Sequence, residues 1–490
     1  MAKLRRLGLT ERQLEMNHFW SYFTANQYDT RKVTWDGRKV LTQIEKDTVG
    51  HSAVMPMGHY AAGNQFDDVS LDMRLPTAPH HLTRVVVKRF TGLLFSAKMH
   101  PTVSVPGDQP MQSWIETLCK VSRIWARFLQ ARDIGGGMGT VAMSFRFQAG
   151  KPQIDVHDAR WCTPTFMDRA TGEISKLEIR YMTPREEQRD GVVKIVWYWY
   201  RRIIDAQSDV VFELAPVGEG EKAGIEPNWE EEKRSDHGIG ECPAVWIRNT
   251  PTDEMDGDPD CLGAYPIQEA IDRLISQADM GAVENADPTL AVSDDEMKLD
   301  AIKKGSRNAF KLATAGHASY VEMTGSGIDS ALKVADVHRH NFLELVQCIL
   351  ETEDAAGGSM TATEVERRYS PMHERGDVFR EQYGEHGIKP LIGKIIRATS
   401  RLARGGGVPT FDQATGHRLV QQVMPGLAKM PPGIERFTDD ALELTWPDWV
   451  KRGPVDAQAA SGAVASARAG QTIDKQSAMA YLATYFDIDD

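Results

Sequence analysis

A short glycine-containing segment, residues 355–361, lies between two long helical patterns and is the feature that most constrains the fold. Gly357 and Gly358 free the backbone there, and Thr361 or Thr363 can cap the helix that follows. A loop of this kind can move without unfolding the helices that carry it. We therefore expect two long helices joined by a movable loop.

The bulk composition is that of a soluble folded protein. The 490 residues are 41% hydrophobic and 26% charged, which leaves room for two to four packing units. No run approaches the roughly 18 apolar residues needed to cross a bilayer, and the basic start of the chain has no apolar core behind it. The five cysteines are scattered and never spaced as CxxC, so we expect buried free thiols in a cytoplasmic protein that does not enter a membrane.

The net charge of −12 argues against a protein that grips DNA tightly, because affinity for the phosphate backbone comes from lysine and arginine. The same charge is compatible with a wall along which DNA slides, since an acidic surface repels phosphate. Taken alone, mild acidity is also explained as a solubility feature.

Hydrophobic periodicity predicts a mixture of helices and strands, an α+β protein. Helices are expected over residues 10–26, 110–132, 263–286, 293–304, 328–353, 362–403 and 455–485. Strands are expected over residues 140–147, 174–181, 193–202, 209–214, 242–247, 308–313, 318–323 and 441–446. Residues 217–240 are interpreted as an exposed loop.

Three of these predictions concern how the helices are arranged. On the helix 263–286, Asp272 lies largely away from the predicted apolar face. On the helix 328–353, the residues expected to point inward are Leu332, Val337, Leu345, Val346 and Ile349. The long helix 362–403 is interrupted by Pro371, Gly376, Gly384, Gly387 and Pro390, so it should kink or break more than once.

Two segments resemble a phosphate-binding loop and a calcium-binding loop, but neither has the residues that its motif requires. The glycine cluster 135–139 follows a helix, precedes a strand and lacks the lysine of a phosphate-binding loop, so a helix end and turn is the better interpretation. The acidic segment 253–260 places Cys261 where a calcium-binding loop starting at Asp256 needs glycine. A solvated acidic turn is expected there.

No catalytic residue, metal site or cofactor is expected. A nuclease or ATPase would need clustered carboxylates or a Walker lysine, and neither is visible in the sequence. His338 and His340 have no nucleophile or ligand set beside them in the sequence, so we interpret them as structural.

The order of elements and several local motifs resemble the portal proteins of tailed bacteriophages, the head-to-tail connectors, of the short-tailed type. The matching segments are Cys242 to Trp246, Leu262 to Ile271, Asn285 to Val292, Met360 to Val365 and Gly387 to Ile392. The resemblance covers residues 242–449 well and 114–181 more weakly. The proline and extra glycines in the long helix, and the segment 408–440, depart from the family pattern.

The resemblance implies a portal fold with a mixed α/β wing, a helical stem, a small α/β clip, a long kinked wing helix and a helical crown. The implied parts are the wing (1–250), first stem helix (251–287), clip (288–327), second stem helix (328–354), tunnel loop (355–361), long wing helix with its closing strand (362–453) and crown (454–490).

The resemblance also implies a function: a dodecameric ring at one capsid vertex of the virion, assembled in the host cytoplasm, through which double-stranded DNA is packaged and ejected. Its partners would be the large terminase, the head-tail adaptor, and the major capsid and scaffolding proteins. Twelve copies would carry 12 × −12, on the order of −144 charges. Another structural protein of a capsid or tail ring, or a packaging enzyme, is the alternative.

Two groups of site residues follow from the resemblance. Gly357, Gly358, Ser359 and Met360 would form the tunnel loop that faces DNA and hinders its slipping back. Lys298, Lys303, Lys304 and Arg307 would form a basic group in the clip, for DNA, terminase or adaptor. The alternatives are an ordinary loop between helices and a solvated helix face.

Overall fold

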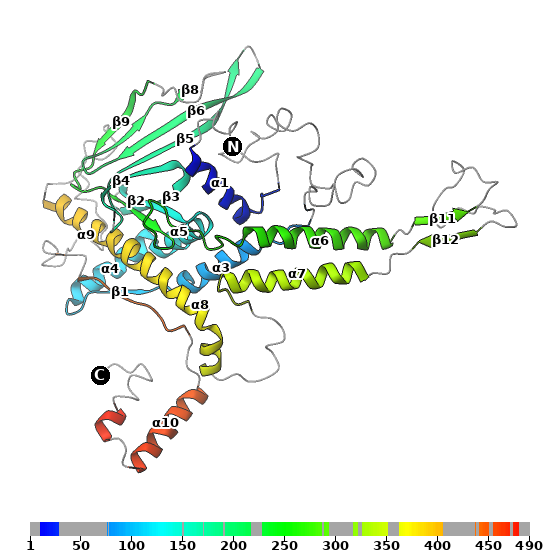
Figure 1. Cartoon of the computed structure of the whole chain (residues 1–490). Coiled ribbons are helices and arrows are strands. Elements are labelled where there is room, and N and C mark those ends of the chain that lie inside the picture. The colour runs from blue at the N-terminus through cyan, green and yellow to red at the C-terminus, as the bar shows by residue number, and fades with distance from the viewer. Residues whose placement is uncertain are drawn as a thin grey trace. The chain divides into compact units, whose positions relative to one another are not determined.

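The structure is a computed structural model in which helices and sheets occur together, so the predicted α+β class is confirmed (Figure 1). It describes residues 10–28, 76, 78–148, 151–169, 171–189, 192–216, 228–286, 289–293, 317–321, 326–350, 362–404, 437, 441–449, 454–470 and 474–479. The chain divides into two compact units whose segments alternate. The first unit comprises Met1–Arg89, Ala131–Met143 and Val156–Val346, and the second Phe90–Gln130, Ser144–Asp155 and Gln347–Asp490.

The first unit contains a large antiparallel sheet with the order β4-β5-β6-β7-β9, to which β8 adds by pairing with β6. Its strands are β4 (Cys162–Asp168), β5 (Glu173–Arg189), β6 (Val192–Ile204), β7 (Ser208–Phe212), β8 (Ala215–Pro216) and β9 (Glu231–Asp236). The predicted strands 174–181, 193–202 and 209–214 correspond to β5, β6 and β7, and the β5–β6 pairing runs from Leu177 opposite Ile204 to Arg189 opposite Val192. The predicted loop 217–240 is wrong at β9, whose charged residues suit an exposed edge strand.

A smaller sheet with the order β10-β2-β3 completes the β-structure of this region. It is built from β2 (Thr140–Gln148), β3 (Lys151–Asp158) and β10 (Ala244–Arg248), and the short helix η3 (Ala159–Trp161) follows β3. The core of the first unit lies where apolar residues of the two sheets meet, and Trp246 is its largest side chain. The other core members include Met138, Ala142, Cys162, Leu177, Ile179, Ile204 and Ala244. We call these two sheets with η3 the sheet layer.

Three helices of the first unit match the predicted segments. They are α1 (Glu11–Thr24), α6 (Tyr265–Ala286) and α7 (Ser326–Leu345), and the strands β11 (Thr289–Ser293) and β12 (His317–Val321) pair between α6 and α7. α7 ends eight residues before its predicted end, because Gln347 adopts a left-handed backbone with a φ of 51°. Ser293, the first residue of the predicted helix 293–304, is the last residue of the strand β11, and the rest of that helix and the predicted strand 308–313 lie outside the described residues.

The predicted helix 110–132 is wrong at both its middle and its end. Arg123, with a φ of 52°, divides it into α4 (Gln109–Ser122) and α5 (Ile124–Met138). α5 then continues through Gly135, Gly136 and Gly137, and only Gly139 adopts a positive φ, of 93°. α3 (Leu82–Phe95), α5, β2 and β3 each pass from one unit into the other.

The second unit is built around a long helical path. α8 (Ala362–Tyr383), a π-helical segment at Gly384–Ile388 and α9 (Lys389–Arg404) follow one another directly. The path bends within α8 (Figure 1), but the predicted breaks do not occur. β1 (Thr102–Ser104) pairs with β13 (Glu443–Thr445), and α10 (Pro454–Ala469) lies near the end of the chain.

The glycines in the long helix serve packing and do not break the helix. A Cβ on Gly376 would lie 2.8 Å from Cη2 of Trp449, and one on Gly384 would lie 3.2 Å from Leu444. Trp449 lies between the ring of His373, stacked at 5.2 Å, and the guanidinium of Arg380, 3.3 Å from the centre of the indole. The segment after β13 can therefore approach α8 only because these positions lack side chains.

Gly376→Ala should destabilise the second unit, although alanine normally favours a helix by about 1 kcal/mol over glycine. The new methyl group would push Trp449 out of its place between His373 and Arg380, at a net cost of about 1–2 kcal/mol. Gly92→Ala in α3 is the matched control, because nothing lies within 4 Å of its Cβ, and it should stabilise. Denaturant unfolding of both variants checks this, and equal stabilisation would contradict it.

Candidate functional site: the paired helices α6 and α7 and their base

Two antiparallel helices, α6 and α7, run side by side (Figure 1) and form the most distinctive element of the first unit. Gly263, with a φ of 81°, turns the chain before α6. Pro266 lies in the first turn of α6, where the missing N–H of a proline costs no hydrogen bond within the helix. A Cβ on Gly281 would lie 3.1 Å from Ile328, so this glycine lets the helices approach closely. Ala335 and Phe342 are the buried residues of α7.

The flank of α7 carries large apolar residues that are exposed in the single chain. Val334, Val337 and Leu345 recur at helical spacing on this flank, with exposed fractions of 46%, 58% and 53%. We call these three residues the α7 stripe. The prediction of inward residues is confirmed for Val346, which is buried, and wrong for Leu332, Val337 and Leu345, which are exposed. Ala335 and Phe342 share the buried face with Val346.

A polar row lies beside the α7 stripe. Its members follow one another at intervals of three and four residues and are all exposed: Asp329, Lys333, Asp336, His340 and Glu344. α7 therefore has a packed face, an apolar flank and a wet face. Such a division suits a helix that contacts water on one side and another protein surface on the next.

The base of α6 is fixed by a narrow row of buried polar residues at intervals of four. Gln268 accepts hydrogen bonds from the backbone N–H (3.1 Å) and the hydroxyl (2.6 Å) of Thr83. Asp272 accepts from the hydroxyl of Tyr28 (2.8 Å) and from the backbone N–H of His80 (2.6 Å). Burial raises the pKa of the Asp272 carboxyl, and these hydrogen bonds oppose that rise. Asp272 lies off the predicted apolar face of α6, as expected, but it is nevertheless fully buried, because Tyr28 and the backbone of His80 cover it.

A buried ion pair lies just before α6. Arg132 of α5 and Asp260 are both fully enclosed, and Nη2 of Arg132 lies 3.0 Å from both carboxylate oxygens. Asn249 donates a further hydrogen bond of 2.9 Å to Asp260. The acidic segment 253–260 is therefore not a solvated turn, because Asp260 is fully buried and Asp256 pairs with Arg12.

The glycine cluster brings this segment against α5. A Cβ on Gly136 would lie 2.7 Å from the Asp260 carboxylate, and one on Gly139 would lie 2.0 Å from the carbonyl oxygen of Gly257. The backbone of Gly136 also accepts a hydrogen bond from Asp260 N–H, at 2.9 Å. These glycines allow two backbones to touch, and Gly139, with its positive φ directly after Met138, also forms the predicted helix end and turn.

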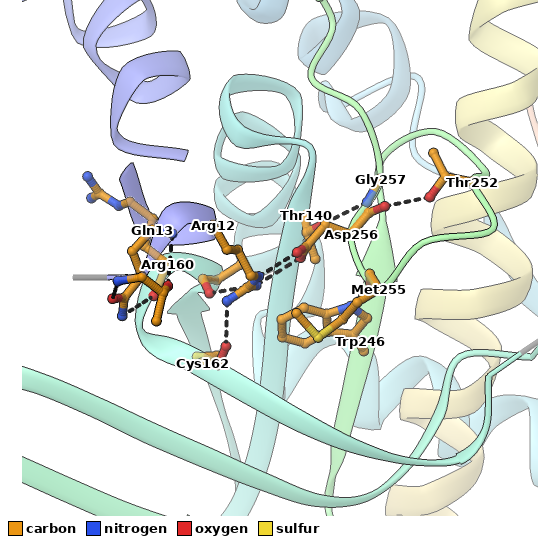
Figure 2. Close-up of polar contacts among 12 residues, drawn as sticks. Arg12, Gln13, Thr140, Arg160, Cys162, Trp246, Thr252, Met255, Asp256 and Gly257 are labelled. Atoms are coloured by element: carbon orange, nitrogen blue, oxygen red, sulfur yellow. Dashed lines mark hydrogen bonds and ion pairs between the residues drawn. The ribbon is translucent and has the colours of Figure 1, made fainter. Parts of the chain in front are cut away.

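Arg12 connects α1 to the sheet layer, and its side chain points from α1 towards Asp256 (Figure 2). Its Nε and Nη2 donate to the Asp256 carboxylate, and Nη1 and Nη2 donate to the carbonyl oxygens of Cys162 and Ala159, each at 3.0 Å. The guanidinium also lies 5.6 Å from the centre of the Trp246 ring. The planar guanidinium of an arginine carries five N–H donors and can therefore bind several acceptors at once.

None of the site residues predicted from the sequence is among the residues that the structure describes. Gly357, Gly358, Ser359 and Met360, and likewise Lys298, Lys303, Lys304 and Arg307, lie outside the described residues. The polar residues at the base of α6 were missed. The spacing of Gln268, Asp272 and Ser276, three polar residues on one narrow row, is the signal that could have revealed a buried polar contact.

No group of three or more His, Cys, Asp or Glu side chains in the described part of the chain is placed to hold a metal ion. None of the helices described there is both long and apolar enough to span a membrane. The five cysteines are buried free thiols, as predicted.

No protein-family model matches the chain, and no curated protein sequence matches it. Among solved structures, a chain described as part of the virion of a native gene transfer agent particle is similar. It has 12% sequence identity and a TM-score of 0.31, over 71% of this chain and 81% of that chain. A TM-score this low does not establish a shared fold.

Proposed function

We propose that the chain is a portal protein, a subunit of a closed ring through which double-stranded DNA enters and leaves a virus capsid. The α7 stripe is the observation that carries the proposal. A single soluble chain seldom leaves valine and leucine half exposed in a row along a long helix, and a second copy would bury them. Contact between the stripe of one copy and a different face of the next repeats around an axis and closes a ring.

The roles of the other elements follow within this proposal. α6 and α7 would be the paired stem helices, with the exposed polar row of α7 towards the wet channel. β11 and β12, which lie between them in the chain, would begin the clip with its basic group Lys298, Lys303, Lys304 and Arg307. The segment 355–361 would be the tunnel loop, and α8 to α9 the long wing helix. The net charge of −12 per copy would let DNA slide without ion pairs.

The partners belong to the proposal as well. The ring would sit at one capsid vertex among the major capsid and scaffolding proteins, dock the large terminase during packaging and receive the head-tail adaptor afterwards. In this role the chain would supply a channel and a docking platform and would carry out no catalysis. A structural ring elsewhere in the capsid or tail is the alternative, and it would not bind terminase.

Electron microscopy of the purified full chain tests the proposal. We expect closed rings of about twelve copies with a central hole, counted in top views, and retention of the large terminase by immobilised rings. A protein that remains a monomer at every concentration would overturn the ring. Rings that fail to retain terminase would favour the alternative of another capsid or tail ring.

Replacing both Gly357 and Gly358 with proline should leave rings intact but reduce the yield of DNA-filled heads. Proline fixes the backbone of the proposed tunnel loop and prevents its movement against DNA. The measurement is the proportion of full heads in an infection complemented with the variant. The double proline variant of Gly218 and Gly220, in the predicted surface loop, is the control, and normal packaging by both variants would refute the role of the tunnel loop.

A further inference from the structure

α1 is attached at two separate places to two different parts of the first unit. At its first turn, Arg12 holds Asp256 and two carbonyl oxygens of the sheet layer (Figure 2). Gln13 adds a hydrogen bond of 3.0 Å to the carbonyl oxygen of Arg160, and Nη1 of Arg160 donates back to Asn17 at 2.7 Å. All of these partners belong to the sheet layer or to the segment that precedes α6.

At its other end, α1 contacts the first two turns of α6. The hydroxyl of Tyr22 donates to Glu269, and Tyr28, just beyond α1, donates to Asp272. The rings of Phe19 and Tyr22 lie 5.5 and 4.5 Å from the ring of Tyr265. These contacts of α1 with α6 lie at the base of α6, the point at which the direction of a long helix is set.

We propose that α1 is a strap that fixes the direction in which α6, and α7 with it, leaves the sheet layer. In this arrangement Arg12 is a positioning residue: its hydrogen bonds go to Asp256 and the sheet layer and not to α6, yet it holds one end of a helix whose other end contacts α6. A helix of 14 residues spans about 21 Å and transmits such a constraint because it does not bend easily. The strap belongs to the single chain, so it acts whether or not copies assemble.

The hydrogen bonds of Arg12 can be removed without unfolding the sheet layer. Both Arg12 and Asp256 keep about a fifth of their side-chain surface exposed, at 21% each, so water can replace the contacts if the arginine leaves. The core residue Trp246 keeps its own hydrogen bond to the carbonyl oxygen of Met255, at 2.8 Å, independently of Arg12. Removal of the guanidinium should therefore free α1 and leave the core in place.

Hydrogen–deuterium exchange of the full chain carrying Arg12→Met tests the strap. Methionine keeps an apolar stem over Trp246 and removes every hydrogen bond of the guanidinium. We expect amides of α1 and of residues 265–276 in α6 to exchange about tenfold faster, while the paired amides of β5 and β6 stay unchanged. Arg234→Met is the matched control, because Arg234 pairs with Glu231 on the edge strand β9, and it should change neither helix.

Three outcomes would overturn the proposal. Faster exchange in α1 with no change in α6 would make α1 a local attachment. Equally faster exchange in β5 and β6 would make Arg12 a general stabiliser of the unit. Additive effects of Arg12→Met and Tyr28→Phe on α6 exchange would show that the two ends are not coupled through α1. Should Arg12→Met fail to fold, Arg12→Lys keeps the charge, loses the fork and is read by the same three criteria.

Discussion

Val337→Glu should abolish self-association of the purified chain while leaving its fold intact. Val337 is the most exposed member of the α7 stripe, so a glutamate there is hydrated in the single chain. In an assembled ring the same carboxylate would be buried without a partner, which costs several kcal/mol at every contact. Light scattering should then report a mass near the 54.6 kDa of one chain in place of a multiple of it.

A control on the same helix separates charge from position. His340→Glu adds the same negative charge within the exposed polar row beside the stripe, and rings of that variant should form normally. Far-UV circular dichroism of both variants should match the parent, because neither residue is buried in the single chain. If Val337→Glu forms rings at normal yield, the α7 stripe is not the contact between copies, and this conclusion does not depend on the proposed function.

Asp260→Ala should lower the free energy of unfolding of the first unit by about 3–5 kcal/mol. The change leaves the guanidinium of Arg132 fully buried without its carboxylate, which is the costly way to break a buried ion pair. It also removes one acceptor of the Asn249 side chain amide, which keeps its hydrogen bond to the carbonyl oxygen of Asp258. Denaturant unfolding monitored by hydrogen–deuterium exchange of the β10 amides, which belong to the first unit, measures the loss of free energy of unfolding.

Two further variants make this result specific. Replacing both partners, as Arg132→Met with Asp260→Leu, should recover much of the loss, since apolar residues of similar volume often replace a buried pair without cost. Glu231→Ala breaks an exposed pair on β9 and should leave the unfolding midpoint where it is. An unchanged midpoint for Asp260→Ala would contradict the structural assignment of Arg132 and Asp260 as a buried pair.

Prediction from the sequence succeeded where a local pattern is sufficient. Alternation of apolar residues located β5, β6 and β7, and spacing at three and four located α1, α6, α7 and the path from α8 to α9. It failed at glycines, because a glycine that ends a helix and one that admits a neighbouring side chain look the same in sequence. Gly136 and Gly376 are of the second kind, and their partners, Asp260 and Trp449, are distant in the chain.

For the candidate site, too, some features were predictable from the sequence and others were decided only by the tertiary structure. The sequence alone located the glycine segment 355–361, the two long helices before and after it, and a net negative charge suited to a channel. Only the tertiary structure decided which face of each helix is packed. Leu332, Val337 and Leu345 of α7 were expected to point inward, but Ala335 and Phe342 are the buried residues of this helix and the α7 stripe stays outside. Likewise Asp272 and Asp260 are buried because hydrogen-bond partners from distant segments meet them there. Periodicity shows that a helix has an apolar face, but which neighbour covers it depends on chain packing that no local pattern records.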